Sequence, residues 1–177
     1  MKVQPFETSK LFDKNFVIPE GCTLTINPGG TSSGKTYSIM QVLSLIASTQ
    51  ENKVITVCGQ DIPNLKKGAL RDLQTIISSS EFLQHQIKNY NKSDRIYEFN
   101  SGSIIEFNSY DDAQDAKNGK RDYLFVNEAN GVPYNVFSEL FQRTSIHTWV
   151  DYNPTAEFWV HTRQAMNWEG EKGMKPS

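Results

Sequence analysis

Apolar and polar positions follow periods that switch repeatedly between those of strands and those of helices. Apolar residues at helical spacing predict amphipathic helices at 35–48, 64–79 and 134–143. Short β-branched and aromatic runs predict strands at 22–27, 54–58, 123–126 and 147–150. Because strands alternate with helices, the pattern predicts an α/β fold whose mainly parallel sheet is covered by helices on both faces.

One stretch departs from this alternation. Two β-rich runs, 95–99 and 103–107, flank the short turn Asn100-Ser101-Gly102 and predict a β-hairpin insertion near 95–107. The polar, Asp-rich stretch 109–119 is expected to be a loop. The hairpin aromatics are expected to pack in the core rather than to stack on bases; they are Tyr90, Tyr97, Phe99 and Phe107.

Length and composition restrict the class of protein. The 177 residues predict a single domain over 1–177, with an N-terminal extension at 1–20 and a disordered tail at 168–177. A net charge of −2 means that any contact with nucleic acid needs a local basic patch. No apolar run approaches the roughly 20 residues of a membrane helix, and no secretory signal opens the chain. Cys22 and Cys58 are expected to be reduced core cysteines of an intracellular protein.

The strongest chemical signal lies between the first predicted strand and the first predicted helix. The segment reads Gly29-Gly30-Thr31-Ser32-Ser33-Gly34-Lys35-Thr36 and fits G-x-x-x-x-G-K-[ST] at every fixed position. Backbone N–H groups of such a loop cradle phosphate oxygens at a helix N-terminus. Lys35 would neutralise the β- and γ-phosphates, and the Thr36 hydroxyl would coordinate Mg²⁺. The segment predicts a nucleotide site, against the alternative of a Gly/Ser-rich loop with a chance lysine.

A second polar element follows the predicted strand 123–126. Glu128 is the candidate general base, which would take a proton from the attacking water; the alternative is that it merely caps the next loop. Asn127 stands where an aspartate is usual. Either its amide oxygen accepts a hydrogen bond from a Mg²⁺-bound water and metal binding is weaker, or Asp151, after the next predicted strand, supplies the carboxylate.

Other P-loop enzymes fit less well. The segment 118–122 has one residue too many for the guanine-selecting N-K-x-D box, and no D-x-x-G follows, which disfavours a GTPase. Small kinases match the length but close an arginine-bearing lid, whereas only Arg143 and Arg163 follow Glu128. A nucleotide or small-molecule kinase, and a nucleotide-binding remnant without turnover, both remain as alternatives.

Two basic clusters are candidates for contact with DNA phosphates, although a cluster of three is more often a solvated surface. They are Lys66, Lys67 and Arg71, and Lys117, Lys120 and Arg121.

The phosphate loop and several other motifs follow one another along the chain. The phosphate loop is followed by Lys120-Arg121-Asp122-Tyr123-Leu124-Phe125-Val126-Asn127-Glu128-Ala129-Asn130, then Phe141-Gln142-Arg143-Thr144, then Asp151-Tyr152-Asn153-Pro154 with Phe158-Trp159. Over about residues 22–163, this set resembles the ATPase half of a tailed-phage terminase large subunit. The resemblance implies a P-loop NTPase of the ASCE (RecA-like) type that uses ATP with Mg²⁺ to translocate double-stranded DNA into a procapsid. It also implies a homo-oligomeric ring, a portal protein and a small terminase subunit as partners, no membrane, and the cytoplasm of the infected bacterial host as the location.

The resemblance also implies residue roles. Lys35 and Thr36 take the phosphate and metal roles, and Glu128 that of the catalytic base. Asn153 matches an element proposed to sense the γ-phosphate and couple hydrolysis to movement. Arg121 has the offset of an arginine finger that reaches into the neighbouring subunit; the alternative is an exposed basic residue paired with Asp122 or Asp115.

Two departures limit this transfer. Asn127 replaces the usual acidic residue. Terminase large subunits also carry a C-terminal nuclease, whereas this chain stops soon after Trp159; we therefore expect a truncated or separately encoded ATPase half and no nuclease activity.

Overall fold

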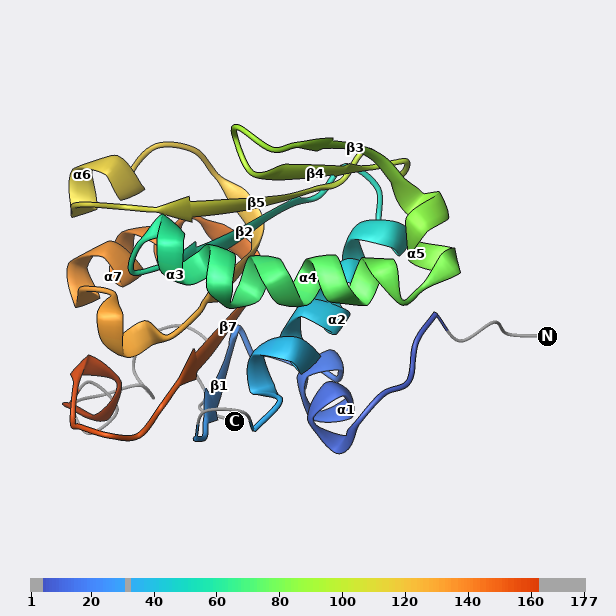
Figure 1. Ribbon diagram of the computed structural model, residues 1–177. Coiled ribbons are helices and arrows are strands. Elements are labelled where there is room, and N and C mark those ends of the chain that lie inside the picture. The colour runs from blue at the N-terminus through green and yellow to red at the C-terminus, as the bar shows by residue number, and fades with distance from the viewer. Residues whose placement is uncertain (1–4, 31–32, 163–177) are drawn as a thin grey trace.

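The computed structural model describes residues 5–30 and 33–162. Within these residues, the strands are β1 (Leu24–Pro28), β2 (Val54–Gly59), β3 (Ile87–Asn91), β4 (Ile96–Phe99), β5 (Ile104–Ser109), β6 (Arg121–Val126) and β7 (Thr144–Tyr152). The helices are α1 (Lys10–Phe16), α2 (Lys35–Thr49), α3 (Ile62–Lys67), α4 (Ala69–Ser78), α5 (Glu81–Gln86), α6 (Ala113–Ala116) and α7 (Tyr134–Gln142), with a 3-10 turn, η1 (Ala129–Gly131) (Figure 1).

The described strands form one seven-stranded sheet in the order β1-β7-β6-β2-β5-β4-β3. Neighbours from β1 to β5 are parallel, whereas β4 and β3 are added antiparallel at one end. The predicted mainly parallel sheet is therefore confirmed. Because Pro28 is in register with Tyr152, and Val126 with both Val150 and Cys58, the loops that follow β1, β7, β6 and β2 meet at one edge.

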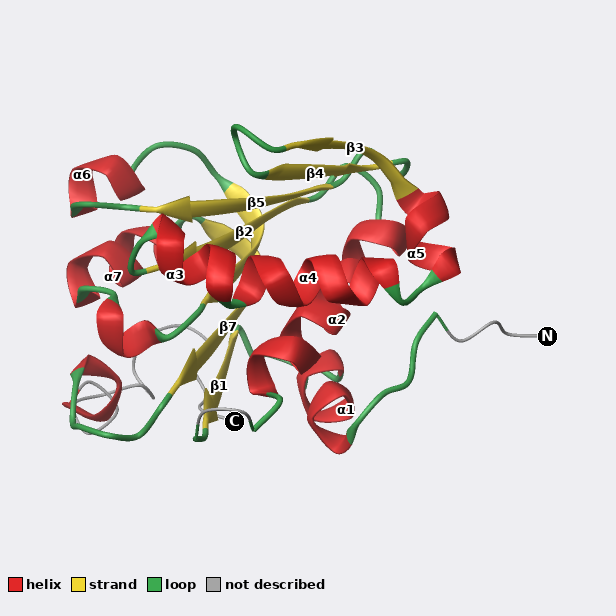
Figure 2. Cartoon of the chain, in the orientation of Figure 1, coloured by secondary structure: helices red, strands yellow, loops and turns green. Residues whose placement is uncertain are grey.

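Each face of the sheet has its own core, because successive side chains of a strand point to opposite faces. Along β6, Tyr123 and Phe125 pack in the cluster that includes α2 and α4, whereas Leu124 and Val126 pack in the cluster that includes α7. Helices therefore cover both faces, as expected (Figure 2).

The predicted hairpin is β4 and β5, but it is not an appendage. Strand β5 pairs in parallel with β2, so the hairpin extends the main sheet. The hairpin aromatics Tyr97, Phe99 and Phe107 are buried, and Tyr90 stacks on Tyr97 at 4.1 Å, as expected. The edge strand β3 and the helix α5 before it were not predicted, because their polar residues face solvent and leave little periodicity.

Glycine divides the predicted helix 64–79. Gly68 ends α3 and precedes α4 with φ −115° and ψ −102°, which is not helical. Helix α3 begins earlier than expected, because the Asp61 side chain caps it by accepting a hydrogen bond from the N–H of Asn64 at 2.7 Å. The break redirects the chain, so α4 starts near the edge of the sheet where the phosphate loop lies.

The structure places a helix within the N-terminal extension and corrects one predicted loop and the bounds of one predicted strand. The extension 1–20 contains α1, whose Phe12 is buried and packs against residues of α2. The expected loop 109–119 contains the short helix α6, and β7 is longer than the predicted 147–150. The predicted tail at 168–177 lies outside the described residues, and the single-domain division of the chain stays a prediction.

Both cysteines are buried and free, as expected, and burial raises the pKa of the Cys58 thiol to about 12. None of the helices in the described part of the chain combines the length and apolar character that a transmembrane span requires.

Candidate nucleotide-binding site

The phosphate loop connects β1 to α2. The N–H of Gly29 donates to the carbonyl of Tyr152 at 3.1 Å, which ties the start of the loop to the end of β7. Gly34 has φ +82° where α2 begins, a left-handed conformation that a side chain would strain. Lys35 is only 8% exposed, and its Nζ donates to the carbonyl of Gly30 at 3.1 Å. Two predicted loop residues, Thr31 and Ser32, lie outside the described part of the chain.

A pocket of about 360 Å³ opens beside this loop, and we call it the phosphate-loop pocket. It is lined by residues 33–37 of the loop and α2, residues 71–72 of α4, Glu128 after β6, and Asn153 after β7. The structure thus brings together Lys35, Thr36, Glu128 and Asn153 in one cavity. Their proposed roles stay predictions, but the shared cleft on which those roles depend is present.

Asp151 is the centre of a hydrogen-bond network beside this pocket. The Thr36 hydroxyl donates to its Oδ2 at 2.6 Å, and the Glu128 N–H donates to its Oδ1 at 2.6 Å. The Asn127 amide nitrogen donates to both carboxylate oxygens at 3.1 Å. Burial raises the pKa of Asp151 to about 6, an effect opposed by these hydrogen bonds and by the charge of Lys35.

The orientation of Asn127 differs from the sequence expectation. Its amide was expected to accept a hydrogen bond through its oxygen, but its nitrogen donates to Asp151 and, at 3.3 Å, to the Thr36 hydroxyl. The amide can donate in this way because residue 127 is not a carboxylate. The structure therefore favours the other alternative, in which Asp151 supplies the negative charge of the site.

The oxygen donors at this point fit a magnesium ion. Mg²⁺ in nucleotide sites usually takes one or two protein oxygens and completes its shell with phosphate oxygens and waters. The Thr36 hydroxyl and the Asp151 carboxylate lie together beside the pocket and are of this kind. Within residues 5–30 and 33–162, no group of three His, Cys, Asp or Glu side chains forms a metal site.

Glu128 occupies a strained backbone position at the end of β6. Its φ of +51° and ψ of +59° lie in the left-handed region, which costs a non-glycine residue about 1–2 kcal/mol. The hydrogen bond from its N–H to Asp151 and the turn formed when Gly131 N–H donates to its carbonyl at 2.9 Å hold this conformation. The side chain is exposed and lines the phosphate-loop pocket. Such strain is typical of functional positions.

Three pocket residues were not predicted as part of the site: Tyr37, Arg71 and Asp72. In the sequence, Arg71 belongs to a basic cluster with Lys66 and Lys67, within a segment predicted to be one continuous helix. The break at Gly68 separates them, and α4 carries Arg71 into the pocket. Gly68 within a helical run is the signal that would have indicated this break.

Arg121 lies at the opposite end of β6. The five residue steps to Val126 correspond to about 17 Å of extended strand. Its side chain is buried, its Nε donates to Thr56 Oγ1 at 3.0 Å, and one terminal nitrogen donates to the Leu140 carbonyl at 3.2 Å. The alternative of an exposed basic residue is therefore wrong. The role of an arginine finger stays a prediction, and it would require Arg121 to leave these contacts.

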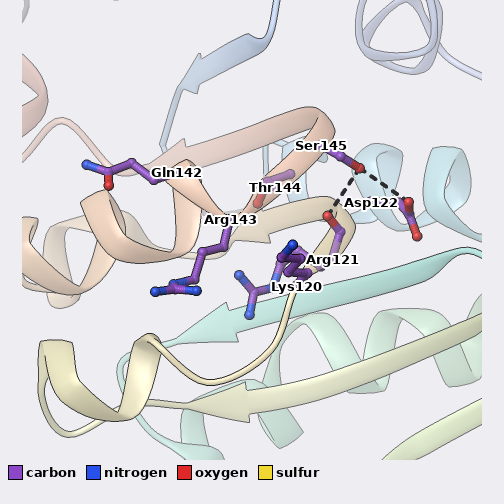
Figure 3. A pocket seen from close by; sticks show the side chains of 7 residues that line it. All are labelled: Lys120, Arg121, Asp122, Gln142, Arg143, Thr144 and Ser145. Carbon is purple, nitrogen blue, oxygen red and sulfur yellow. Dashed lines mark hydrogen bonds between the residues drawn. The ribbon is translucent and has the colours of Figure 1, made fainter.

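A second pocket, of about 600 Å³, lies at that end of the sheet. Its lining comes from residues 120–122 and 142–145, so the side chains of Lys120, Arg121 and Arg143 gather between the start of β6 and the end of α7 (Figure 3). Because Arg121 is buried, the basic cluster that includes it is not a surface patch of three side chains. The other cluster is divided between α3 and α4, and its Arg71 lines the phosphate-loop pocket.

The parallel sheet, the glycine-rich loop after its first strand and the pocket at the carboxyl ends of its strands define a P-loop NTPase fold. A family model described as the phage terminase large subunit matches residues 23–171, and the chain belongs to this family. No curated protein matches the sequence.

Solved structures show the same fold at low sequence identity. The large terminase of a thermophilic bacteriophage matches with a TM-score of 0.76 and 14% identity, over 97% of this chain and 45% of that one. The complex of the same terminase with ADP matches with a TM-score of 0.75 and 16% identity, over the same shares. The large terminase ATPase domain of Thermus phage P74-26 matches with a TM-score of 0.70 and 11% identity, over 93% of this chain and 72% of that one. The chain thus spans less than half the length of the first of these terminases.

Proposed function

We propose that this chain is the ATP-hydrolysing motor domain of a viral DNA-packaging terminase, which couples hydrolysis to translocation of DNA into a procapsid. One observation carries the proposal: the phosphate-loop Lys35 and the candidate base Glu128 line a single pocket. Family membership supports the packaging role. It also favours a motor over a small-molecule kinase.

The pocket suggests how hydrolysis would proceed. Backbone N–H groups of the loop and Lys35 bind the phosphates of ATP. Glu128 takes a proton from a water, whose oxygen attacks the γ-phosphorus as the bond to the β,γ-bridging oxygen breaks and ADP leaves. Asn153, which lines the same pocket, would contact the γ-phosphate. Mg²⁺ held by Thr36 and Asp151 would neutralise charge on the β- and γ-phosphates.

The partners belong to the same proposal. Matched structures of the thermophilic phage terminase include complexes with ADP and with ATP-gamma-S, which supports ATP as the nucleotide. Double-stranded DNA, a portal protein, a small terminase subunit and a homo-oligomeric ring are the partners that a packaging motor needs. The place of action would be the cytoplasm of the infected bacterial host.

The test is ATP turnover with and without Mg²⁺, for the wild type and for Glu128→Gln. We expect Glu128→Gln to lower turnover by about 10²–10⁴-fold, because the amide cannot accept the proton, while nucleotide affinity stays within about twofold. Glu51→Gln is the matched control, since Glu51 is exposed and does not line the pocket.

Other outcomes separate the alternatives. Nucleotide binding without turnover at any protein concentration would indicate a binding remnant. Transfer of phosphate to a nucleoside monophosphate would indicate a kinase.

A further inference from the structure

We propose that Arg71 is a catalytic residue of its own chain: its guanidinium contacts the γ-phosphate in the phosphate-loop pocket and stabilises the charge that develops there during hydrolysis. The inference rests on the proposed function and adds a residue to that site.

The position of Arg71 follows from the start of α4. A Cβ atom on Gly68 would lie 3.6 Å from Oδ1 of Asn127, so α4 begins against the carboxyl end of β6. Arg71 follows three residues later and lines the same cavity as Lys35, Glu128 and Asn153. Because a general base must lie beside the attacking water, Glu128 marks the γ-phosphate end of this cavity.

Among the described residues, the Arg71 guanidinium has no hydrogen-bond or ion-pair partner that would fix it elsewhere. Among residues 5–30 and 33–162, its nitrogens make no hydrogen bond or ion pair; the one ion pair in that set joins Arg143 to Glu139. The adjacent Asp72 interacts with it electrostatically: partial burial raises the pKa of Asp72, and the charge of Arg71 opposes that rise. Within the described chain, Arg71 is thus a free cation at the pocket wall, whereas Arg121 is bound within the protein.

The helix itself disfavours a cation at this place. Arg71 lies in the first turn of α4, where the helix dipole is positive and opposes a positive side chain. A bound triphosphate reverses that disadvantage, because both the dipole and the guanidinium then face negative charge. An arginine in the first turn is therefore explained by an anionic ligand better than by helix stability.

The charge of the site also favours a second cationic side chain beside Lys35. Lys35 is the one cation that the phosphate loop supplies, and three carboxylates, those of Asp72, Glu128 and Asp151, lie in or beside the pocket. An arginine matches phosphate oxygens with two parallel N–H donors. It contributes most where charge grows in the transition state, which in ATP hydrolysis is around the γ-phosphoryl group.

The experiment compares the wild type with Arg71→Ala and Arg71→Lys in the full chain. We expect Arg71→Ala to lower ATP turnover about a hundredfold or more. Its affinity for a non-hydrolysable ATP analogue should fall about tenfold, while its affinity for ADP stays within about twofold, because ADP lacks the γ-phosphate. Arg71→Lys should recover part of both losses. Lys88→Ala is the control, since it removes an exposed charge from β3 outside the pocket and should change neither quantity.

Three results would overturn the inference. The first is unchanged ATP turnover and analogue affinity in Arg71→Ala, and the second is an equal loss of affinity for ADP and for the analogue. The third is recovery of turnover when Arg71→Ala is mixed with Lys35→Ala, since recovery would show that the arginine acts between chains. The proposed function fails separately, through a wild type that does not hydrolyse ATP. In that case the ratio of analogue to ADP affinity still tests Arg71.

Discussion

Asp151 and Asn127 form a donor–acceptor pair at the carboxyl ends of neighbouring strands. The carboxylate is fully buried and accepts hydrogen bonds from the Thr36 hydroxyl, the Asn127 amide and the Glu128 N–H. An aspartate at position 127 would remove one donor and place a second negative charge about 3 Å from the first. The amide is therefore an integral part of the hydrogen-bond network around Asp151.

Exchanging the two residue types tests whether the site needs one amide paired with one carboxylate. Asn127→Asp should lower Mg²⁺-dependent ATP turnover about tenfold and destabilise the fold by about 1–3 kcal/mol, because the buried carboxylates repel each other. The double variant Asn127→Asp with Asp151→Asn restores one carboxylate and one amide and should recover stability in thermal unfolding. If Asn127→Asp alone matches or exceeds the wild type in turnover, the pairing has no such role.

At the scale of elements, α1 is joined to the sheet by polar contacts. Asn15 of α1 and Asn27 of β1 exchange two side-chain hydrogen bonds of 2.8 and 3.0 Å, and both residues are buried. The Trp149 indole N–H donates to the Asn15 carbonyl at 3.0 Å. Because β1 leads directly into the phosphate loop, α1 supports the strand from which the loop starts.

Removing one member of this amide pair should destabilise the protein. We expect Asn15→Ala to lower the free energy of unfolding by about 1–3 kcal/mol, because the Asn27 amide is left buried with fewer partners. Urea unfolding measures this loss. In a double-mutant cycle, the combined variant with Asn27→Ala should cost less than the sum of the two single variants. Strict additivity would show that the pair is not coupled.

At the scale of the whole molecule, the two pockets lie at opposite ends of the parallel strands. The phosphate-loop pocket uses the carboxyl ends of β6 and β7, whereas the pocket around Arg121 uses their amino ends. The rigid sheet between them keeps these two regions apart and in a fixed relation. Its stability depends on buried groups throughout, and His147 of β7 is one whose pKa is shifted by burial.

Acid should weaken the fold through His147. Burial lowers the pKa of His147 to about 4, although its ring is hydrogen-bonded to the Cys22 carbonyl and Thr25 hydroxyl. The unfolded chain then binds a proton near pH 6.5 while the native chain does not, so the contribution of His147 to stability should fall by about 3 kcal/mol between pH 6.5 and 4. Asp151 and Asp72, whose pKa values are raised, act in the opposite direction.

The comparison with His147→Gln isolates this effect. Glutamine keeps a donor and an acceptor but does not titrate, so urea midpoints of the variant should decline less between pH 6.5 and 4 than those of the wild type. Parallel declines would show that other groups cause the acid sensitivity.

The sequence alone determined the parallel core, the phosphate loop and the strand that leads to Glu128. These are local features: apolar runs specify buried strands, and glycine and lysine at fixed spacing specify a phosphate cradle. Helix α1 and strand β3 gave little local signal, because short polar elements are stabilised by the neighbours that they contact.

Only the tertiary structure decided which distant side chains meet. It turned the Asn127 amide toward Asp151, brought Arg71 into the pocket and buried Arg121 at the far end of its strand. These outcomes depend on which strands are neighbours in the sheet and on the direction that α4 takes after Gly68. The spacing of residues along the chain specifies neither the order of the strands nor the direction of the helix. Burial and hydrogen bonding between remote segments exist only after the chain has folded.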